Sequence, residues 1–374
     1  QRVEFRFDRR FQAITGATRQ ALEKQVEKGF PFLPGGTQIV LDRQSQAAVL
    51  ANLRAQVVST TRQMVAELRA HPTEELAKFL NEAGVELSDV VRSDRSWTKI
   101  RREAGVAIAP TGPNETALLK RIRAFAHVDD PERAAAYTRW FAEDAPNYDD
   151  PSLSELDRAF ARMLYFSLWP DGGHFTSYAA GLASLRMEPN VREDLRQVIA
   201  LALSRAAHVT RPLEGRLSGL PLRVDATYTR EEAVSALDYA SIDGRKPNSF
   251  REGVLWSEAH QSDAFFVTLN KSEEDYSPST MYRDYFISPE HFHWESQSTT
   301  TIASRTGQRY INHEALGTAV LLFARDHKAT AFGSGAPYRF YGPLTYQLHE
   351  GERPMSIVWS RITQTEANQG LSIP

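Results

Sequence analysis

Apolar residues recur every three or four positions along most of the chain between residues 12 and 205. This spacing is typical of amphipathic helices that bury one face. Boundary residues support the pattern, since Pro131 stands at a first-turn position and Gly84 follows the end of another segment. The segments that fit a helix best are 17–30, 43–57, 73–84, 115–128, 131–144, 153–169 and 191–207.

The pattern changes in the second half of the chain. Thr229 and Glu232 have the spacing of a capping box ahead of a short helix at 233–240. Beyond it, short runs of β-branched and aromatic residues separated by turn residues predict an antiparallel sheet or a partly open barrel. We therefore expect an α+β protein, with a helical region at residues 1–215 and a β-rich domain at 216–374. The predicted strands are 253–258, 264–271, 299–304, 318–325, 336–349 and 354–362.

Composition narrows the class of protein. None of the 374 residues is cysteine, which removes disulfides, thiol nucleophiles and thiolate metal ligands. No apolar run is long enough to cross a bilayer, so we expect a cytoplasmic protein with no membrane partner. The net charge of −3 argues against bulk attraction to nucleic acid, but residues 296–349 carry five Lys or Arg against two Asp or Glu, a net of +3. A local basic face is therefore available.

Motifs of common catalytic sites are missing from the sequence. It has no GxSxG nucleophile turn and no GxxxxGK[ST] phosphate loop, so we expect no hydrolase that uses a serine or cysteine nucleophile and no ATPase activity. His291 and His293 are two apart, which on a strand puts both on one face, but no further ligand pattern accompanies them. The sequence thus predicts a region that is not itself an enzyme and holds no metal and no cofactor.

One catalytic alternative remains open. Asp326 and Lys328 follow a predicted strand with the D-x-K spacing of nucleases that hold a divalent ion beside a lysine. Any strand that ends in a charged turn produces the same spacing by chance. The competing interpretation is therefore a solvated hairpin end.

The run at 287–310 combines histidines, aromatic residues, hydroxyl residues and two arginines. Polar groups in a core must each find a hydrogen-bond partner, so this density suits contact with a ligand. Aromatic rings can sandwich an unpaired base while hydroxyls and an amide read its edge, and arginines can clamp flanking phosphates. The candidate DNA-binding or base-binding residues here and just upstream are Lys271, Tyr282, Tyr285, His293, Trp294, Ser296, Gln297, Arg305, Arg309 and Tyr310.

Trp294 is the preferred stacking residue of this set. It stands between His293 and Glu295 in a run with few other apolar residues. For each tyrosine or phenylalanine, the competing interpretation is the core of a β-rich domain.

A second candidate contact lies in the helical half. Trp97 precedes Lys99, Arg101 and Arg102 on a short segment that closes with Ala-Gly. A tryptophan anchor on a basic helix fits a small helix-turn-helix-like unit that meets the DNA backbone. The competing interpretation is a solvated helical face.

Several separate motifs resemble one known family. They are the runs at 267–300, TGQRYINH (306–313), VLLFARDHK (320–328), YRFYGPLTY (338–346) and HEGERPMSIVW (349–359). In this order they resemble the domain of unknown function found C-terminal to superfamily 2 DEAD/DEAH-type helicases, which often carry an N-terminal phospholipase-D-type nuclease. The first 36 residues look like the stretch that follows the last helicase motifs.

The resemblance implies a role for the chain within a longer protein. It implies the C-terminal half of a type IV restriction enzyme, whose helicase and nuclease domains lie elsewhere in the same polypeptide. Such enzymes cut DNA that contains methylated or hydroxymethylated cytosine, and their C-terminal region is taken to recognise the target. The expected partner is therefore double-stranded DNA with a modified cytosine, read by base flipping. A structural module that couples motor to nuclease is the alternative without base contact.

Overall fold

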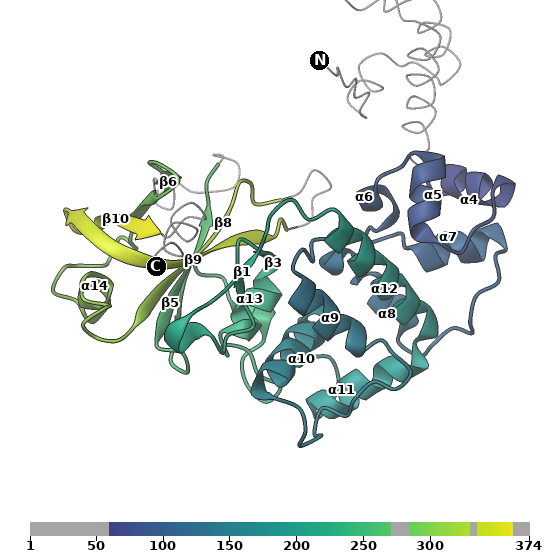
Figure 1. The fold of residues 1–374 in the computed structure, drawn as a ribbon, viewed down its shortest axis with the longest axis horizontal. Coiled ribbons are helices and arrows are strands. Elements are labelled where there is room, and N and C mark those ends of the chain that lie inside the picture. The colour runs from purple at the N-terminus through teal and green to yellow at the C-terminus, as the bar shows by residue number, and fades with distance from the viewer. Residues whose placement is uncertain (1–59, 271–283, 330–334, 362–374) are drawn as a thin grey trace, which may run out of the picture. The chain divides into compact units, whose positions relative to one another are not determined.

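The computed structural model describes residues 60–270, 284–329 and 335–361 (Figure 1). Helices precede a sheet-rich region, which confirms the α+β prediction. Among the described residues, none of the helices is both long enough and apolar enough to cross a membrane.

The chain forms two compact units. Of the described residues, the first unit contains 60–126 and Met187–Leu201, and the second contains His127–Arg186 and those from Ala202 to Arg361. Within the described residues the first strand begins at Arg211, close to residue 215, where the sequence predicts a boundary. Three helices before that point nevertheless belong to the same unit as the sheet.

Helices build the described part of the first unit. Thr60 caps one helix by accepting a hydrogen bond from the backbone N–H of Gln63, and Gly105 ends another in the left-handed conformation. The predicted helix at 115–128 is a short α-helix followed by a 3₁₀ turn, and nothing in the local sequence explains the break. The helices are α4 (Thr61–Ala70), α5 (Leu76–Ala83), α6 (Leu87–Val90), α7 (Trp97–Ala104), α8 (Glu115–Leu119) and most of α12 (Pro189–Ser204).

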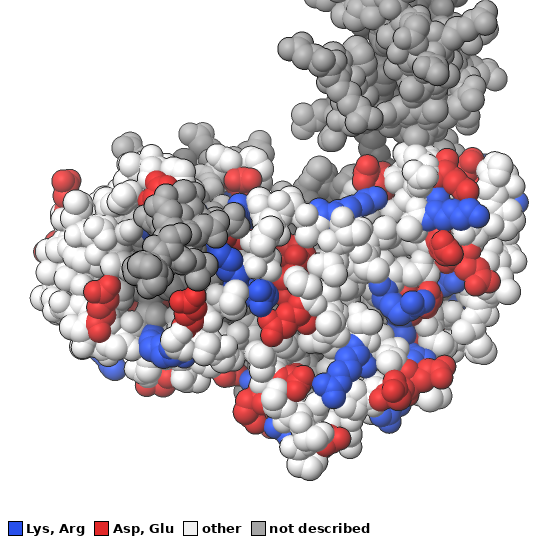
Figure 2. Space-filling model, viewed as in Figure 1, with Lys and Arg blue, Asp and Glu red and all other residues white. Residues whose placement is uncertain are grey.

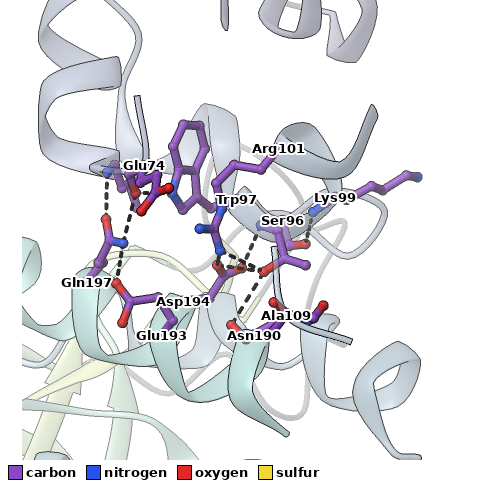
Figure 3. A network of polar contacts seen from close by, with 12 residues as sticks. Glu74, Ser96, Trp97, Lys99, Arg101, Ala109, Asn190, Glu193, Asp194 and Gln197 are labelled. Atoms are coloured by element: carbon purple, nitrogen blue, oxygen red, sulfur yellow. Dashed lines mark hydrogen bonds and ion pairs between the residues drawn. The ribbon is translucent and has the colours of Figure 1, made fainter. Parts of the chain in front are cut away.

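A buried carboxylate joins α7 to α12 in this unit (Figure 3). Asp194 accepts hydrogen bonds from the backbone N–H of Thr98 at 3.0 Å and from its hydroxyl at 2.9 Å, and Arg101 lies 3.7 Å away. Burial raises the pKa of Asp194 to about 6, against the opposing hydrogen bonds and the Arg101 charge. Trp97 is fully buried, and its ring centre lies 4.9 Å from that of Phe79 in α5. The tryptophan therefore anchors α7, as the sequence predicts.

A second buried acid holds the helices of the second unit. These helices are α9 (Pro131–Arg139), α10 (Glu155–Leu168), α11 (Tyr178–Ser184) and α13 (Arg230–Ala236). The predicted capping box of Thr229 and Glu232 begins α13. The Glu232 carboxylate also accepts hydrogen bonds from Tyr137 at 2.8 Å and Arg133 at 3.2 Å, both in α9. One carboxylate thus caps α13 and ties it to α9.

In the described part of the second unit, the main sheet has eight strands. Its order is β4-β5-β8-β9-β10-β7-β6, with β3 beside β9, and most pairs are antiparallel as predicted. The exception is β5, which pairs with β8 in parallel. The strands are β3 (Thr227–Tyr228), β4 (Val254–Ser257), β5 (Ser262–Thr268), β6 (Tyr285–Phe286), β7 (His291–Glu295), β8 (Ala319–Arg325), β9 (Tyr338–Glu350) and β10 (Ser356–Arg361); β1 (Arg211–Pro212) and β2 (Arg223–Val224) form a separate pair.

This sheet curls around its own core. Three strands separate β5 from β7 in the sheet order, which in a flat sheet would place them about 19 Å apart. The rings of Phe265 on β5 and Trp294 on β7 instead stack with centres 3.9 Å apart. The sheet therefore wraps until its two sides meet, and the core lies inside the wrap. This shape fits the expectation of a partly open barrel.

The predicted strand at 299–304 is wrong. Its backbone makes turn hydrogen bonds, from Thr300 to Gln297 and from Ser304 to Thr301. The Ser304 hydroxyl then caps α14 (Arg305–Ile311) by accepting from the N–H of Gly307. Hydroxyl residues compete for backbone hydrogen bonds and favour turns and caps, which explains the difference.

Candidate nucleic-acid interface

Strand β7 carries the centre of the predicted base-reading run. It lies between β10 and β6, and its residues alternate between exposed and buried positions. His291 and His293 share the outer face, as their spacing predicts. Phe292 and Trp294 share the inner face and belong to the core.

The position of Trp294 conflicts with its predicted role. Its side chain is 4% exposed, and its ring lies nearly parallel to Phe265, at 10°. Tyr310 covers it edge-on, with ring centres 5.4 Å apart, and is itself 1% exposed. Burial raises the pKa of Tyr310 above its usual range. Both rings are core residues, because alternation along β7 and packing of α14 turn them inward, and a base cannot stack on them in this conformation.

Ser296 is also turned into the fold. It is fully buried, and its hydroxyl accepts a hydrogen bond from the N–H of Met355 at 2.8 Å and donates to the carbonyl of Gln297 at 3.2 Å. These bonds fix the return from β9 to β10, so the hydroxyl is not available to read a base. The side chain of Gln297 is exposed.

The two predicted phosphate clamps differ from each other. Arg305 is exposed at the start of α14. Arg309 instead donates two hydrogen bonds to Asp263, at 2.5 and 2.7 Å, and its guanidinium lies 4.0 Å from the ring centre of Trp256. Burial raises the pKa of Asp263, while the Arg309 contacts lower it. Arg309 is therefore committed to a buried acid, which conflicts with its predicted contact to phosphate.

The outer face of β7 keeps one aromatic pair accessible. Tyr285 on β6 lies directly opposite His293, and their rings stack with centres 4.6 Å apart at 18°. The Nε2 atom of His293 lies 2.6 Å from the hydroxyl oxygen of Ser356 on β10, which fixes the imidazole. Tyr285 remains 49% exposed. We did not predict Ser356, because only the pairing of β7 with β10 brings it to His293.

The remaining predicted DNA contacts in the sheet region cannot be placed. Lys271 and Tyr282 lie outside the described residues.

Fewer of the positive side chains of α7 are available to contact DNA than the sequence predicts. Lys99 is exposed, and Arg102 pairs with Glu115 at 2.7 Å. Arg101 is 5% exposed beside Asp194. Its guanidinium is committed to this buried acid, which conflicts with the predicted contact to the DNA backbone.

Asp326 and Lys328, the residues of the nuclease alternative, lie in an exposed turn after β8. The Asp326 carbonyl accepts a hydrogen bond from the N–H of Asn270 at 2.9 Å. Across the part of the chain that the structure describes, no group of three or more His, Cys, Asp or Glu side chains could hold a metal ion. The nuclease role stays an untested prediction.

The sequence of the sheet region matches a known family. Residues 222–359 match the Domain of unknown function (DUF3427). The DUF3427 match begins beside β2 and ends in β10, so it includes the curled sheet and the Tyr285–His293 pair. This family is known in helicase-associated proteins, in agreement with the resemblance of the motifs. No curated protein matches the chain.

Proposed function

We propose that the chain is the target-recognition region of a type IV restriction enzyme and binds double-stranded DNA that contains a modified cytosine. ATP hydrolysis and cleavage belong to helicase and nuclease domains of the same longer polypeptide. The match of 222–359 to a helicase-associated family and the order of the resembling motifs support this proposal.

The observation that carries the proposal is the accessible Tyr285–His293 pair. Bases stack on aromatic rings, and such stacking contributes about 1–3 kcal/mol per base. Because Ser356 holds the imidazole and the imidazole supports the Tyr285 ring, the platform is ordered before a ligand arrives. An extruded cytosine stacks on Tyr285, and the exposed Gln297 and Arg305 are the further predicted contacts on this domain.

Replacing Tyr285 by Ala is expected to weaken binding to a methylated duplex by about 1–3 kcal/mol, or roughly 5–150-fold in Kd. Binding to an unmodified duplex should change much less, because its bases stay stacked in the helix. Fluorescence anisotropy with labelled duplexes at one salt concentration measures both.

Two variants serve as controls for this prediction. Tyr285→Phe keeps the ring and should bind as the parent does, and Ile287→Ala truncates a neighbour that is 53% exposed. If Tyr285→Ala stays folded and binds the methylated duplex as tightly as the parent, the platform is not the reader.

A further inference from the structure

Two arginines, neither of them considered above as a DNA contact, meet at one edge of the curled sheet. Strands β5 and β8 are parallel, and Thr268 lies opposite Arg325 at the last position of each strand. Tyr338 begins β9, the other neighbour of β8. Arg230 begins α13, and its Nη2 atom donates a hydrogen bond to the Tyr338 hydroxyl at 3.2 Å. The strand ends and the start of α13 thus bring both arginines to one tyrosine.

The ring of Tyr338 is a fixed support for the two positive groups. It is 2% exposed and packs edge-on against Phe266, with ring centres 5.4 Å apart. The guanidinium carbon of Arg325 lies 4.3 Å from the centre of the Tyr338 ring, within the range of a cation–π contact. One positive group therefore lies over the ring, and the other reaches its hydroxyl.

Within the described residues, the two guanidinium groups donate hydrogen bonds to neutral atoms. Arg325 donates from Nε to the Thr268 hydroxyl at 3.1 Å and from Nη1 to the carbonyl of Ala336 at 3.0 Å. Arg230 donates from Nη1 to the carbonyl of Phe250 at 3.4 Å and from Nη2 to the tyrosine hydroxyl. These bonds hold both side chains in place without a carboxylate.

The nearest acids along the chain do not neutralise both charges. Asp326 follows Arg325, but its charge acts on Tyr341, whose pKa is raised by burial and further by this carboxylate. Tyr341 packs against the core inside the wrap, on the sheet face opposite to that of Tyr338.

Glu231 is the other acid to consider. It follows Arg230 in the first turn of α13. In the described part of the chain, neither Arg230 nor Arg325 forms an ion pair with it or with another acid. Even when the Glu231 charge is counted, one positive charge remains in excess.

Both guanidinium groups keep donors for a further acceptor. The Nη2 atom of Arg325 and the Nε atom of Arg230 have no hydrogen-bond partner among the described residues. Both side chains are partly exposed, so a ligand can reach them. A planar guanidinium presents paired donors that match the oxygens of a phosphate. The pair therefore suits an anion with several acceptor oxygens.

A purely structural role would not need two charges. Carbonyl and hydroxyl oxygens accept hydrogen bonds equally well from neutral side chains, and a partly buried charge without a counter-ion costs free energy. Two like charges against one ring also repel each other. A bound anion would relieve both costs.

The distribution of charge elsewhere makes such a pair useful for binding a polyanion. Figure 2 shows the described Lys and Arg side chains interspersed with Asp and Glu over the face that it draws. Attraction to phosphate on that face would be offset by repulsion from the neighbouring acids. Phosphate contacts therefore depend on individual sites where cations are not paired with acids.

We propose that Arg230 and Arg325, held by Tyr338 and Thr268, form a binding site for a phosphate group. That this phosphate belongs to the backbone of bound DNA rests on the proposed function. Binding of free phosphate depends on the arginine pair alone.

The test uses the full chain and the variants Arg325→Gln and Arg230→Gln. Each removes one charge but keeps a side chain that can donate to the same neutral acceptors, so we expect both to fold. Arg325→Lys keeps the charge and loses the planar fork. Arg216→Gln is the matched control, because Arg216 also donates to two carbonyls, those of His260 and Gln261 before the start of β5. Thermal unfolding confirms that each variant is folded.

The first arm measures binding to an unmodified duplex over a range of salt concentrations. We expect about tenfold weaker binding in each Gln variant, the loss of a charged hydrogen bond. The salt slope should fall by roughly 0.9, the value for one lost phosphate contact. Arg325→Lys should bind more weakly than the parent but keep its salt slope, and Arg216→Gln should match the parent in both.

The second arm measures the rise in melting temperature caused by inorganic phosphate against chloride at equal ionic strength. A ligand that binds only the folded state raises this temperature. The parent and Arg216→Gln should show the same rise, and the two Gln variants of the site should lose it.

The two arms separate the sources of phosphate. A loss in the DNA arm alone assigns the site to the DNA backbone, and a loss in both arms assigns it to free phosphate as well. If the parent binds no DNA, the proposed function fails and the phosphate arm decides on the arginine pair: a rise that the Gln variants lose supports the site, and any other result overturns it. Folded Gln variants that behave as the parent does in both arms overturn the proposal.

Discussion

Replacing Glu232 by Gln is expected to lower the free energy of unfolding by about 3–5 kcal/mol, the range for breaking a buried ion pair. Glu232 and Arg133 are both fully buried, 3.2 Å apart. The same carboxylate lies 2.6 Å from the Nε2 atom of His127. A neutral amide removes the Glu232 charge from the buried Arg133 guanidinium, which keeps Asp130 at 3.0 Å and Asp129 at 3.3 Å. Urea titration of the variant and the parent measures the loss.

The free energy of unfolding at acid pH tests the same network of buried charges. Burial alone would raise the pKa of Glu232, but the charges of Arg133 and His127 overcome it and lower the pKa to about 2, against 4.5 when unfolded. Stability from this group is therefore full above pH 4.5 and is lost as the pH falls toward 2. The lowered pKa of Glu232 contributes about 3 kcal/mol to the free energy of unfolding above pH 4.5. We expect this contribution in the parent and not in Glu232→Gln.

A surface carboxylate provides the matched control for this experiment. Glu155 is 86% exposed and pairs with Arg158. Glu155→Gln should change the free energy of unfolding by less than about 1 kcal/mol. Equal losses in the two variants would contradict the role of Glu232 as the tie between α9 and α13.

Replacing Trp294 by Ala is expected to cost about 3–5 kcal/mol of stability, the range for truncating a large buried side chain. The indole fills the space between Phe265 and Tyr310, and Ile357 lies beside it on β10. The cavity cannot close easily, because Phe265 and Ile357 belong to the curled sheet and Tyr310 is held by α14. Trp294→Phe should lose less, since it keeps a ring against Phe265.

The preference for modified DNA distinguishes a core residue from a residue that contacts the base. The folded fraction of the Trp294→Ala protein should keep the parent's preference for modified DNA, and Tyr285→Ala should lose it while losing less than about 1 kcal/mol of stability. A Trp294→Ala protein as stable as the parent but without the preference would show that the indole contacts the base and that its burial is not permanent.

Local sequence signals predicted many of the elements. The capping box of Thr229 and Glu232 marks the start of α13, the glycine after α7 marks its end, and the apolar spacing of α10 indicates an amphipathic helix. Strands β4, β5, β8, β9 and β10 follow from short β-branched and aromatic runs. Hydroxyl-rich residues before α14 misled the prediction, because threonine favours strands on average but also caps and turns.

The site was harder to predict, and Trp294 shows why. Its polar neighbours His293 and Glu295 suggested an exposed position. On a strand, however, adjacent side chains point to opposite faces. Polar neighbours such as His293 and Glu295 are therefore expected beside a tryptophan that is buried on the inner face of a half-exposed strand. Alternation could have revealed this error.

Other site features depend on long-range pairing. Arg309 meets Asp263 across 46 residues of chain, and Arg339 meets Asp225 across 114. No local pattern encodes these contacts. They follow from the packing of α14 on the sheet and from the antiparallel pairing of β3 with β9, which sets Thr227 opposite Arg339.

Titration of the full chain with three duplexes of one sequence tests the proposed function most directly. The duplexes carry unmodified, methylated or hydroxymethylated cytosine, and all are measured at the same salt concentration, since affinity for DNA depends steeply on salt. We expect at least one modified duplex to bind about tenfold or more tightly than the unmodified one, which corresponds to roughly 1.4 kcal/mol. Equal affinity for all three duplexes would contradict recognition of a modified base by this chain.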